Sequence, residues 1–257
     1  MLIVNNHMII VYSILIFFMG MLFSSFFHLM AERLPKNETL LGRSYCLDCK
    51  EKLRLIDVFP LIGYLINKGK CHYCKSKISF YYPLVEVLGG AIFVVAYLLI
   101  GFKIELLIAY VFISVLMIES ISDAIYQIVI DKIWIIGLIP LVVIRIIEKQ
   151  YFQYLLSSAI MFSLLFIIAV LGKLAFKKDA LGGGDIKLYI FIGFCLTWPQ
   201  GLLSLFIASF VGVIYGLLQK RKSETTITLV PFIFLGVLLS YFWGNDILNW
   251  YLNLLGM

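Results

Sequence analysis

Long, uninterrupted apolar runs are the feature that most constrains the fold of this chain. Of its 257 residues, 62% are hydrophobic and 14% are charged, and the mean hydropathy of +1.01 is far above that of a soluble domain. Lipid satisfies no backbone polar group, so segments that cross it must be helices or closed barrels. The runs are continuous rather than alternating, which excludes a barrel. The sequence therefore predicts an all-α, polytopic integral membrane protein in contact with the lipid bilayer.

Eight segments are apolar enough to be membrane spans. We expect them at about 8–30, 84–101, 104–121, 126–147, 152–172, 186–198, 200–218 and 227–244. A helix needs roughly 20 residues to cross the hydrocarbon, so the sixth segment is expected to tilt or to enter without crossing fully. The first is too long for a removable signal peptide and lacks a small-residue cleavage site, so we expect it to be an anchor.

Basic residues are distributed unevenly between the loops. If the eight spans alternate, 18 of the 21 Lys and Arg residues fall on one side, in 31–83, 122–132, 173–187 and 219–223. The other side receives Lys103, Arg145 and Lys149. Cytoplasmic loops carry the excess of positive charge, so we expect the N-terminus outside and the large loop in the cytoplasm. This topology accounts for the net charge of +6, which gives no reason to expect a nucleic-acid partner.

The large loop 31–83 contains four cysteines in two pairs. Cys46 and Cys49 form one C-x-x-C motif, Cys71 and Cys74 form another, and 21 residues separate them. This is close to zinc-ribbon spacing, on the side of the membrane where disulfides do not persist. Four thiolates make a closed structural Zn²⁺ site, which would supply folding energy to a loop with little core of its own. The alternatives are two disulfides or four unpaired thiols. Cys195, alone in an apolar helix, is expected to be a small buried hydrophobe.

Two aspartates lie at the edges of the apolar segments. Asp123 lies at the end of an apolar run, and Asp185 directly follows three glycines, Gly182-Gly183-Gly184. A carboxylate in a membrane helix costs roughly 2.5–3.5 kcal/mol at the helix centre, so its presence suggests function. Two such groups on helices that pack together would form a shared-proton dyad, the acid–base pair of aspartic proteolysis. The alternative is that both are helix-end caps that face water.

Neighbouring residues suggest how the dyad is supported. Glycine permits close backbone approach, so an extended substrate could lie against Gly182, Gly183 and Gly184; a flexible linker is the alternative. Lys187 is expected near the dyad, where it would hold one aspartate ionised or serve as a basic membrane anchor. Glu119 lies four residues before Asp123 and hence on the same helical face, with either a tuning or a structural role.

These motifs together resemble the type IV prepilin peptidases. Gly42-Arg43-Ser44-Tyr45 precedes the first cysteine pair, Lys68-Gly69-Lys70 precedes the second, and Tyr82-Pro83-Leu84-Val85-Glu86 follows. Asp123 and Gly182-x-Gly184-Asp185-Ile186-Lys187 then match the family's two catalytic-aspartate motifs in order. The likeness extends from the first helix to about residue 200, and its details look most like the competence-pseudopilin processing members of Gram-positive bacteria.

The resemblance implies an intramembrane aspartic endopeptidase with Asp123 and Asp185 as catalytic residues. It would cut the basic leader from prepilin or pseudopilin substrates at the cytoplasmic face. In many family members the same chain then methylates the new N-terminal amine with S-adenosylmethionine. We expect a methyl-donor site near Glu86 and Gly90, although Glu86 could instead contact the substrate or be a helix-start charge. The alternative is a peptidase without methyltransferase activity.

The implied organisation has three parts: an anchor helix at 1–30, the four-cysteine zinc loop domain at 31–83, and a peptidase helical domain at 84–257. Two departures from the family pattern stand out. His28 ends the segment Ser24–His28, where the family often has Gly-Ser-Phe-Leu-Asn, and Val129-Ile130-Asp131 replaces Leu-Pro-Asp. A proton-coupled transporter would also use buried carboxylates, but the internal repeats typical of that class are not evident. A zinc-bearing scaffold would leave the glycine–aspartate segment unexplained.

Overall fold

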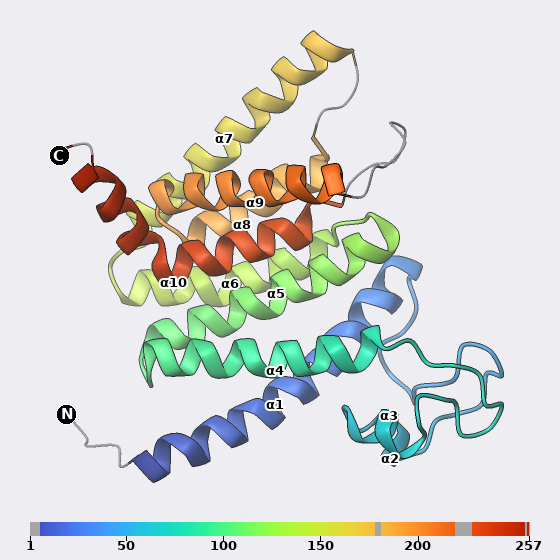
Figure 1. Cartoon of the computed structure of the whole chain (residues 1–257). Coiled ribbons are helices and arrows are strands. Elements are labelled where there is room, and N and C mark those ends of the chain that lie inside the picture. The colour runs from blue at the N-terminus through green and yellow to red at the C-terminus, as the bar shows by residue number, and fades with distance from the viewer. Residues whose placement is uncertain (1–5, 178–180, 219–227, 255, 257) are drawn as a thin grey trace. The chain divides into compact units, whose positions relative to one another are not determined.

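The computed structural model describes residues 6–177, 181–218, 228–254 and 256. Within these residues the secondary structure is helical, apart from two isolated β-bridges in the cysteine loop (Figure 1). The chain divides into two compact units, Met1–Leu106 and Leu107–Met257. The basic stretch 219–223 and Lys178, which contributed to the expected charge bias, lie outside the described residues.

The first unit consists of two long helices and the cysteine loop between them. Its elements are α1 (Asn6–Arg33), the 3₁₀ turn η1 (Leu34–Lys36), the short α2 (Leu55–Val58) and α3 (Ile62–Ile66), and α4 (Tyr81–Ile100). Helices α1 and α4 pack side by side because each has a glycine at the crossing (Figure 1). A Cβ on Gly20 would lie 2.9 Å from the Cα atom of Gly90, and a Cβ on Gly90 would lie 2.8 Å from the Phe17 carbonyl oxygen. Glycine is therefore required there to let the two backbones approach.

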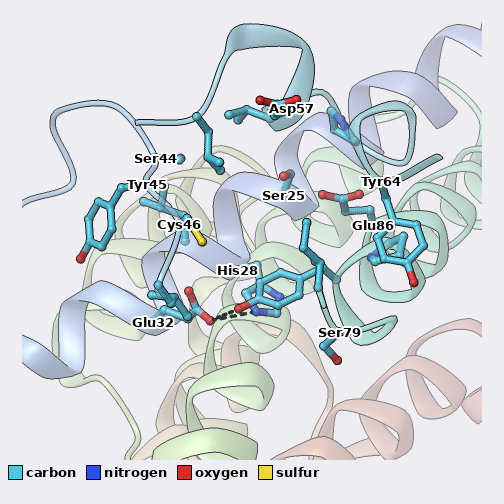
Figure 2. A pocket seen from close by; sticks show the side chains of 18 of the residues that line it. Ser25, His28, Glu32, Ser44, Tyr45, Cys46, Asp57, Tyr64, Ser79 and Glu86 are labelled. Atoms are coloured by element: carbon cyan, nitrogen blue, oxygen red, sulfur yellow. Dashed lines mark hydrogen bonds and ion pairs between the residues drawn. The ribbon is translucent and has the colours of Figure 1, made fainter. Parts of the chain in front are cut away.

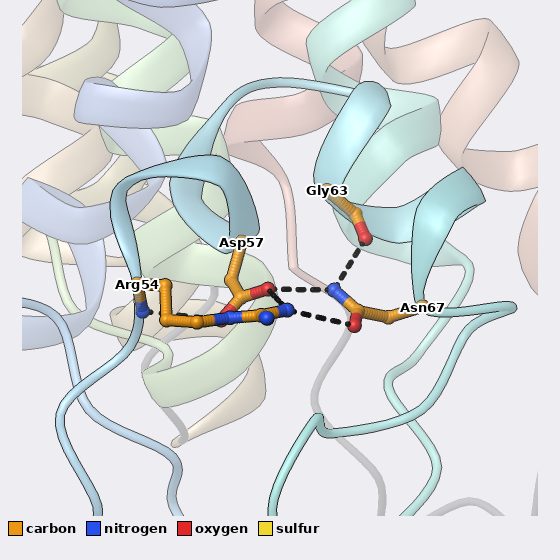
Figure 3. A network of polar contacts seen from close by, with 4 residues as sticks. All are labelled: Arg54, Asp57, Gly63 and Asn67. Carbon is orange, nitrogen blue, oxygen red and sulfur yellow. Dashed lines mark hydrogen bonds and ion pairs between the residues drawn. The ribbon is translucent and has the colours of Figure 1, made fainter.

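A polar network holds α2 and α3 together inside the loop (Figure 3). The Arg54 guanidinium donates to both carboxylate oxygens of Asp57, at 3.0 and 2.8 Å. The Asn67 amide donates to Asp57 Oδ1 at 2.8 Å and to the Gly63 carbonyl oxygen at 2.9 Å. The hydrogen bonds from Arg54 hold the pKa of Asp57 well below its usual range, against the opposing effect of burial. The loop thus owes part of its fold to a charged pair as well as to its cysteines.

The second unit is a bundle of six helices. They are α5 (Ile104–Tyr126, whose first residues precede the division), α6 (Asp131–Ile147), α7 (Tyr151–Phe176), α8 (Gly183–Cys195), α9 (Trp198–Leu218) and α10 (Val230–Leu254). Helix α8 packs against α6 and α7, and α9 packs against α10 (Figure 1). Eight of the 13 residues of α8 are buried, as expected of a helix in the middle of a bundle.

The C-terminal end of α8 receives hydrogen bonds from its neighbours. The last carbonyls of a helix have no partner within the helix. Arg145 of α6 donates to the carbonyl oxygens of Phe194 and Cys195 at 3.3 and 3.4 Å, and Ser157 of α7 donates to that of Leu196 at 2.8 Å. These bonds allow a short helix to end inside the protein, and they fix the axial position of α8 relative to α6 and α7.

Among the described residues, six of the eight expected segments are helices that could cross a membrane, and the sixth segment is short, as expected. Six described helices, namely α1 with η1, α4, α5, α7, α9 and α10, are long and apolar enough to cross a membrane. Helices α6 and α8 occupy the expected fourth and sixth segments but have 17 and 13 residues. At 1.5 Å per residue, α8 rises only about 20 Å against a hydrocarbon core of about 30 Å. The chain is therefore an all-helical, multi-pass membrane protein with two shorter helices packed into its second unit.

Candidate active site and metal centre

Asp123 lies near the C-terminal end of α5 and is 7% exposed. Its carboxylate accepts a hydrogen bond from the backbone N–H of Val230 at 3.1 Å, and it also accepts one from the Leu229 N–H. These N–H groups belong to the start of α10, where the helix dipole favours negative charge. The position of Asp123 is therefore set by a contact between two elements more than 100 residues apart in sequence.

Asp185 lies in the first turn of α8, after the N-cap residue Gly182. It is half-buried, and its carboxylate accepts a hydrogen bond from the Gly182 backbone. The two carboxylates, Asp123 and Asp185, are close enough for their charges to repel each other. Repulsion between neighbouring carboxylates in a poorly solvated site favours a state that holds one shared proton.

The three glycines before Asp185 differ in the space around them. A Cβ on Gly184 would lie 2.8 Å from both Cβ and Cγ2 of Val129, and a Cβ on Gly182 would lie 2.8 Å from Asp185 Oδ2. A Cβ on Gly183 would have no atom within 4 Å. Gly182 therefore lets the Asp185 carboxylate approach the backbone, and Gly184 lets the turn after α5 approach it. The position of Gly183 tolerates a side chain.

Lys187 forms an ion pair with a residue that we did not include in the candidate site. Its ammonium lies 2.8 Å from Oδ2 of Asp131, the first residue of α6. Asp131 also accepts a hydrogen bond from the indole N–H of Trp134 at 3.2 Å. Through this pair Lys187 connects the start of α8 to the start of α6, next to the turn that contains Val129.

Glu119 is completely buried on α5. Its Oε2 atom accepts a hydrogen bond from the Ile130 backbone N–H at 2.7 Å, and Ser122 donates to the Ile128 carbonyl oxygen at 2.8 Å. Both bonds fix the turn between α5 and α6. Of the two roles considered for Glu119, the contacts support the structural one, because it holds the turn against which Gly184 packs.

The two cysteine pairs have the same local backbone structure. Antiparallel bridges join Tyr45 to Lys52 and Lys70 to Lys77. In each C-x-x-C turn, or knuckle, the backbone N–H of the first cysteine donates to the carbonyl oxygen of the residue five positions later. Cys46 donates to Glu51 at 2.9 Å, and Cys71 donates to Ser76 at 2.8 Å. Each tight turn thereby directs backbone N–H groups toward the sulfurs. The N–H of Cys49 is the main reason that the pKa of Cys46 is lowered to about 6, with burial opposing the shift.

The four sulfurs form one cluster. The Sγ atoms of Cys46, Cys49, Cys71 and Cys74 all lie within 4.8 Å of one another, and those of Cys46 and Cys74 are 3.8 Å apart. A tetrahedral ion with bonds of about 2.3 Å separates its sulfur ligands by about 3.8 Å. The cysteines are free rather than paired in disulfides, so the geometry fits a metal ion. Cys195 is buried in α8, as expected.

A cavity of about 610 Å³ lies between α1, the cysteine loop and the start of α4. Figure 2 shows Ser25, His28, Cys46 and Glu86 around it. Glu86 is half-buried there and accepts a hydrogen bond from the Leu61 N–H at 2.8 Å. Gly90 lies one helical turn further along α4 and does not line the cavity; it is the glycine of the α1–α4 crossing.

Comparison with known proteins connects both regions to one family. The family model of the bacterial peptidase A24 N-terminal domain matches residues 18–100, and that of the type IV leader peptidase family matches residues 110–217. A "Prepilin leader peptidase/N-methyltransferase" of Bacillus subtilis (strain 168) is 30% identical over 247 residues, which are 93% of this chain and 98% of the relative. The chain belongs to the type IV leader peptidase family.

Other relatives with the same name are similarly related to this chain. The protein of Legionella pneumophila is 31% identical over 85% of this chain and 78% of its own length. That of Pseudomonas aeruginosa is 26% identical over 93% of this chain and 92% of its own length. No solved structure gives a significant match. The family expected from the sequence motifs is confirmed, and the two matched regions contain the cavity with its cysteine cluster and the aspartate pair, respectively.

A group of residues around the cavity was missed by the sequence analysis. His28 and Glu32 interact at its wall (Figure 2), and the hydroxyl of Tyr82 donates to Glu32. The signal was present in the sequence, because His28 and Glu32 are four residues apart in an apolar helix and therefore share a face. Ionisable residues in such a helix suggest function.

Proposed function

We propose that this chain removes the basic leader from prepilin-like proteins with the dyad Asp123 and Asp185, at the cytoplasmic face of the bacterial membrane. The observation that carries the proposal is that the end of α5, with Asp123, and the start of α8, with Asp185, meet: Val129 in the turn after α5 packs against Gly184, the residue before Asp185. The family membership of the chain and the names of its relatives support leader-peptide cleavage as the reaction class.

The chemistry follows from one shared proton. The ionised aspartate takes a proton from water, and the oxygen of that water attacks the scissile carbonyl carbon. The protonated aspartate donates its proton to the developing oxyanion, and the roles are exchanged when the leaving amine is protonated. A peptide in extended form would reach the dyad past Gly182 and Gly184, where the backbone carries no side chain.

The substrate fits a site at the membrane surface. A leader rich in Lys and Arg stays in the cytoplasm while the apolar helix of the prepilin enters the bilayer, so the scissile bond lies at the interface. The orientation rests on the positive-inside distribution of Lys and Arg. Within the described residues, the basic loop 31–83 carries most of that charge.

For the cysteine cluster, we propose one Zn²⁺ bound by Cys46, Cys49, Cys71 and Cys74. The two knuckles and the sulfur spacing of 3.8 Å support this identity, since four thiolates complete a tetrahedral shell and leave no position for water. The ion would be structural, and it would fix the loop that closes one side of the cavity.

The chain is further proposed to methylate the newly formed N-terminal amine. S-adenosylmethionine would supply an electrophilic methyl group on a sulfonium. The cavity has a volume of about 610 Å³, in the range of small-molecule sites. Apolar and aromatic side chains in its wall, such as Phe59 and Tyr64, suit an adenosyl group. The carboxylates of Glu32 and Glu86 in the same wall suit a cation. The alternative is a peptidase that performs no methylation.

Mass spectrometry of a prepilin coexpressed with this chain tests both activities. The expected product lacks the leader and carries 14 additional mass units on its new N-terminal residue, about one CH₂. A full-length prepilin would refute the peptidase. A cleaved but unmethylated product would leave the peptidase standing and refute the methyltransferase.

A further inference from the structure

His28 and Glu32 lie on the wall of the cavity (Figure 2), and together with Tyr82, which also lines it, they form a connected polar group. Nε2 of His28 lies 3.5 Å from Oε1 of Glu32, and the Tyr82 hydroxyl donates to the same oxygen at 2.6 Å. The His28 and Tyr82 rings pack with centroids 4.3 Å apart. The carboxylate therefore orients the imidazole so that its Nε2–H points to Glu32, which leaves the lone pair on Nδ1.

Two polar groups at this cavity have unused hydrogen-bonding capacity. Nδ1 of His28 is buried and has no hydrogen-bond partner among the described residues, and His28 as a whole is only 4% exposed. Glu86 accepts hydrogen bonds from the Leu61 N–H and the Ser25 side chain. Among the described residues, no Lys or Arg forms an ion pair with it. A buried acceptor and a carboxylate held by neutral donors both favour a cationic ligand that donates hydrogen bonds.

We propose that Glu86 binds the free N-terminal ammonium of the processed substrate and that His28, oriented by Glu32, accepts its proton. This inference rests on the methyl transfer in the proposed function. The titratable groups that face His28 are Glu32 on its own helix and Tyr81, Tyr82 and Glu86 on α4. The two acidic groups on the two helices stabilise the imidazolium formed by the transfer.

The step balances as a proton transfer followed by a displacement. One N–H bond of the ammonium breaks, its proton is bound at Nδ1 of His28, and the electron pair stays on nitrogen. The amine nitrogen then forms a bond to the methyl carbon of the sulfonium donor, and the carbon–sulfur bond breaks with its electron pair left on sulfur. No oxidant or reductant is required, and the proton leaves His28 to solvent when the products depart.

The position of His28 makes this a property of this chain rather than of the family pattern. The related motif often ends in Asn, which cannot accept a proton at neutral pH. The substitution His28→Asn is therefore both a conservative change in size and a direct removal of the proposed base. His7 on the exposed start of α1 provides a matched control histidine.

The first experiment measures binding without a methyl donor. The probe is a synthetic peptide with the mature N-terminal sequence of a prepilin, prepared with a free or an acetylated α-amine, and added to the full chain in lipid nanodiscs. We expect the free-amine peptide to bind roughly 10- to 100-fold more tightly, because one charge-assisted hydrogen bond is lost on acetylation. Glu86→Gln should abolish this preference, while Glu51→Gln, an exposed loop carboxylate outside the cavity, should retain it. Equal binding of both peptides to the wild-type chain would overturn the ammonium site.

The second experiment measures methylation of the free-amine peptide between about pH 6 and 9, a range that spans the ordinary α-amino pKa of about 7.7–8.0. His28→Asn should lower the rate at pH 7 by roughly tenfold or more. Its remaining rate should rise with pH as the amine loses its proton unaided, and it should approach the wild-type rate near the alkaline limit. His7→Asn should follow the wild-type profile.

The outcomes separate this inference from the proposed function. Retained cleavage of full-length prepilin shows that the second unit of each variant is folded, and unchanged protease sensitivity of the 31–83 loop shows that the first unit, which contains His28 and Glu86, is folded as well. A His28→Asn profile that coincides with the wild-type profile would overturn the role of His28. A wild-type chain that cleaves but does not methylate would refute the methyltransferase and the role of His28 with it. The peptide-binding comparison would still decide whether Glu86 holds the amine.

Discussion

Replacing Gly184 by alanine tests how the dyad is positioned. The added Cβ would lie 2.8 Å from two atoms of Val129, whereas ordinary contacts begin near 3.4 Å. Either the start of α8, with Asp185, or the turn that contains Val129 must move by about 0.6 Å or more to restore contact distance. Catalytic geometry is sensitive on this scale, since a displacement of about 1 Å can cost on the order of 100-fold in rate. We expect Gly184→Ala to cleave roughly 10- to 100-fold more slowly than the wild-type chain.

The same geometry supplies a control and a rescue. Gly183→Ala places its Cβ in open space and should cleave at the wild-type rate. Val129→Ala removes the Cγ2 atom that meets the new side chain, although the Cβ–Cβ contact of 2.8 Å remains, so the double variant should recover part of the lost rate. The assay is the initial rate of leader removal from a purified prepilin in nanodiscs. Equal rates for Gly183→Ala and Gly184→Ala would refute the explanation.

Three further predictions concern the loop and the turn next to the dyad. Purified protein should contain about one zinc ion per chain, and the Cys46→Ser variant should lose the ion and have a 31–83 loop that is more sensitive to proteases. Wild-type protein that contains no zinc and whose four thiols are freely alkylated would contradict the site. Because the pKa of Asp57 is lowered in the folded loop, its contribution to loop stability is present above the ordinary Asp pKa near 4 and is lost as the pH falls further, so the loop should become more sensitive to proteases at low pH. Asp57→Asn should remove about 1–2 kcal/mol of loop stability at pH 7, a value reduced by the partial exposure of Arg54, and should make protease sensitivity less dependent on pH. Glu119→Ala should leave the Ile130 N–H unpaired and slow cleavage by displacing the α5–α6 turn. Glu119→Gln keeps an acceptor oxygen and should slow cleavage less, so equal cleavage rates for the two variants would contradict the positioning role.

Much of this arrangement could be predicted from local sequence. The apolar runs gave the positions of the membrane helices, and the spacing of the cysteines anticipated a cluster that the structure brings within 4.8 Å. The order of the Asp123 and Asp185 motifs indicated the family. Each apolar run, each cysteine pair and each aspartate motif is encoded in residues that are near one another in the chain, although the motifs themselves are far apart.

The features that escaped prediction depend on contacts between distant segments. A hydropathy pattern does not distinguish a short span from a buried bundle helix, so the sequence indicated that the sixth segment is short but not that α8 packs against α6 and α7. The pair between Lys187 and Asp131, and the bond from the Val230 N–H to Asp123, join residues 56 and 107 positions apart. Gly90 was expected near a methyl-donor site on the family resemblance alone, which gave no indication that its nearest neighbours are backbone and side-chain atoms of α1.

The central claim is that Asp123 and Asp185 act as one pair. The most direct test is the single-turnover rate of prepilin cleavage by Asp123→Asn and Asp185→Asn, compared with Asp246→Asn at an exposed position on α10. Because one proton must pass between both carboxylates, each of the first two variants should accumulate in the membrane with cleavage abolished, while the control should cleave normally. Near-normal cleavage by either Asp123→Asn or Asp185→Asn would contradict the two-aspartate mechanism.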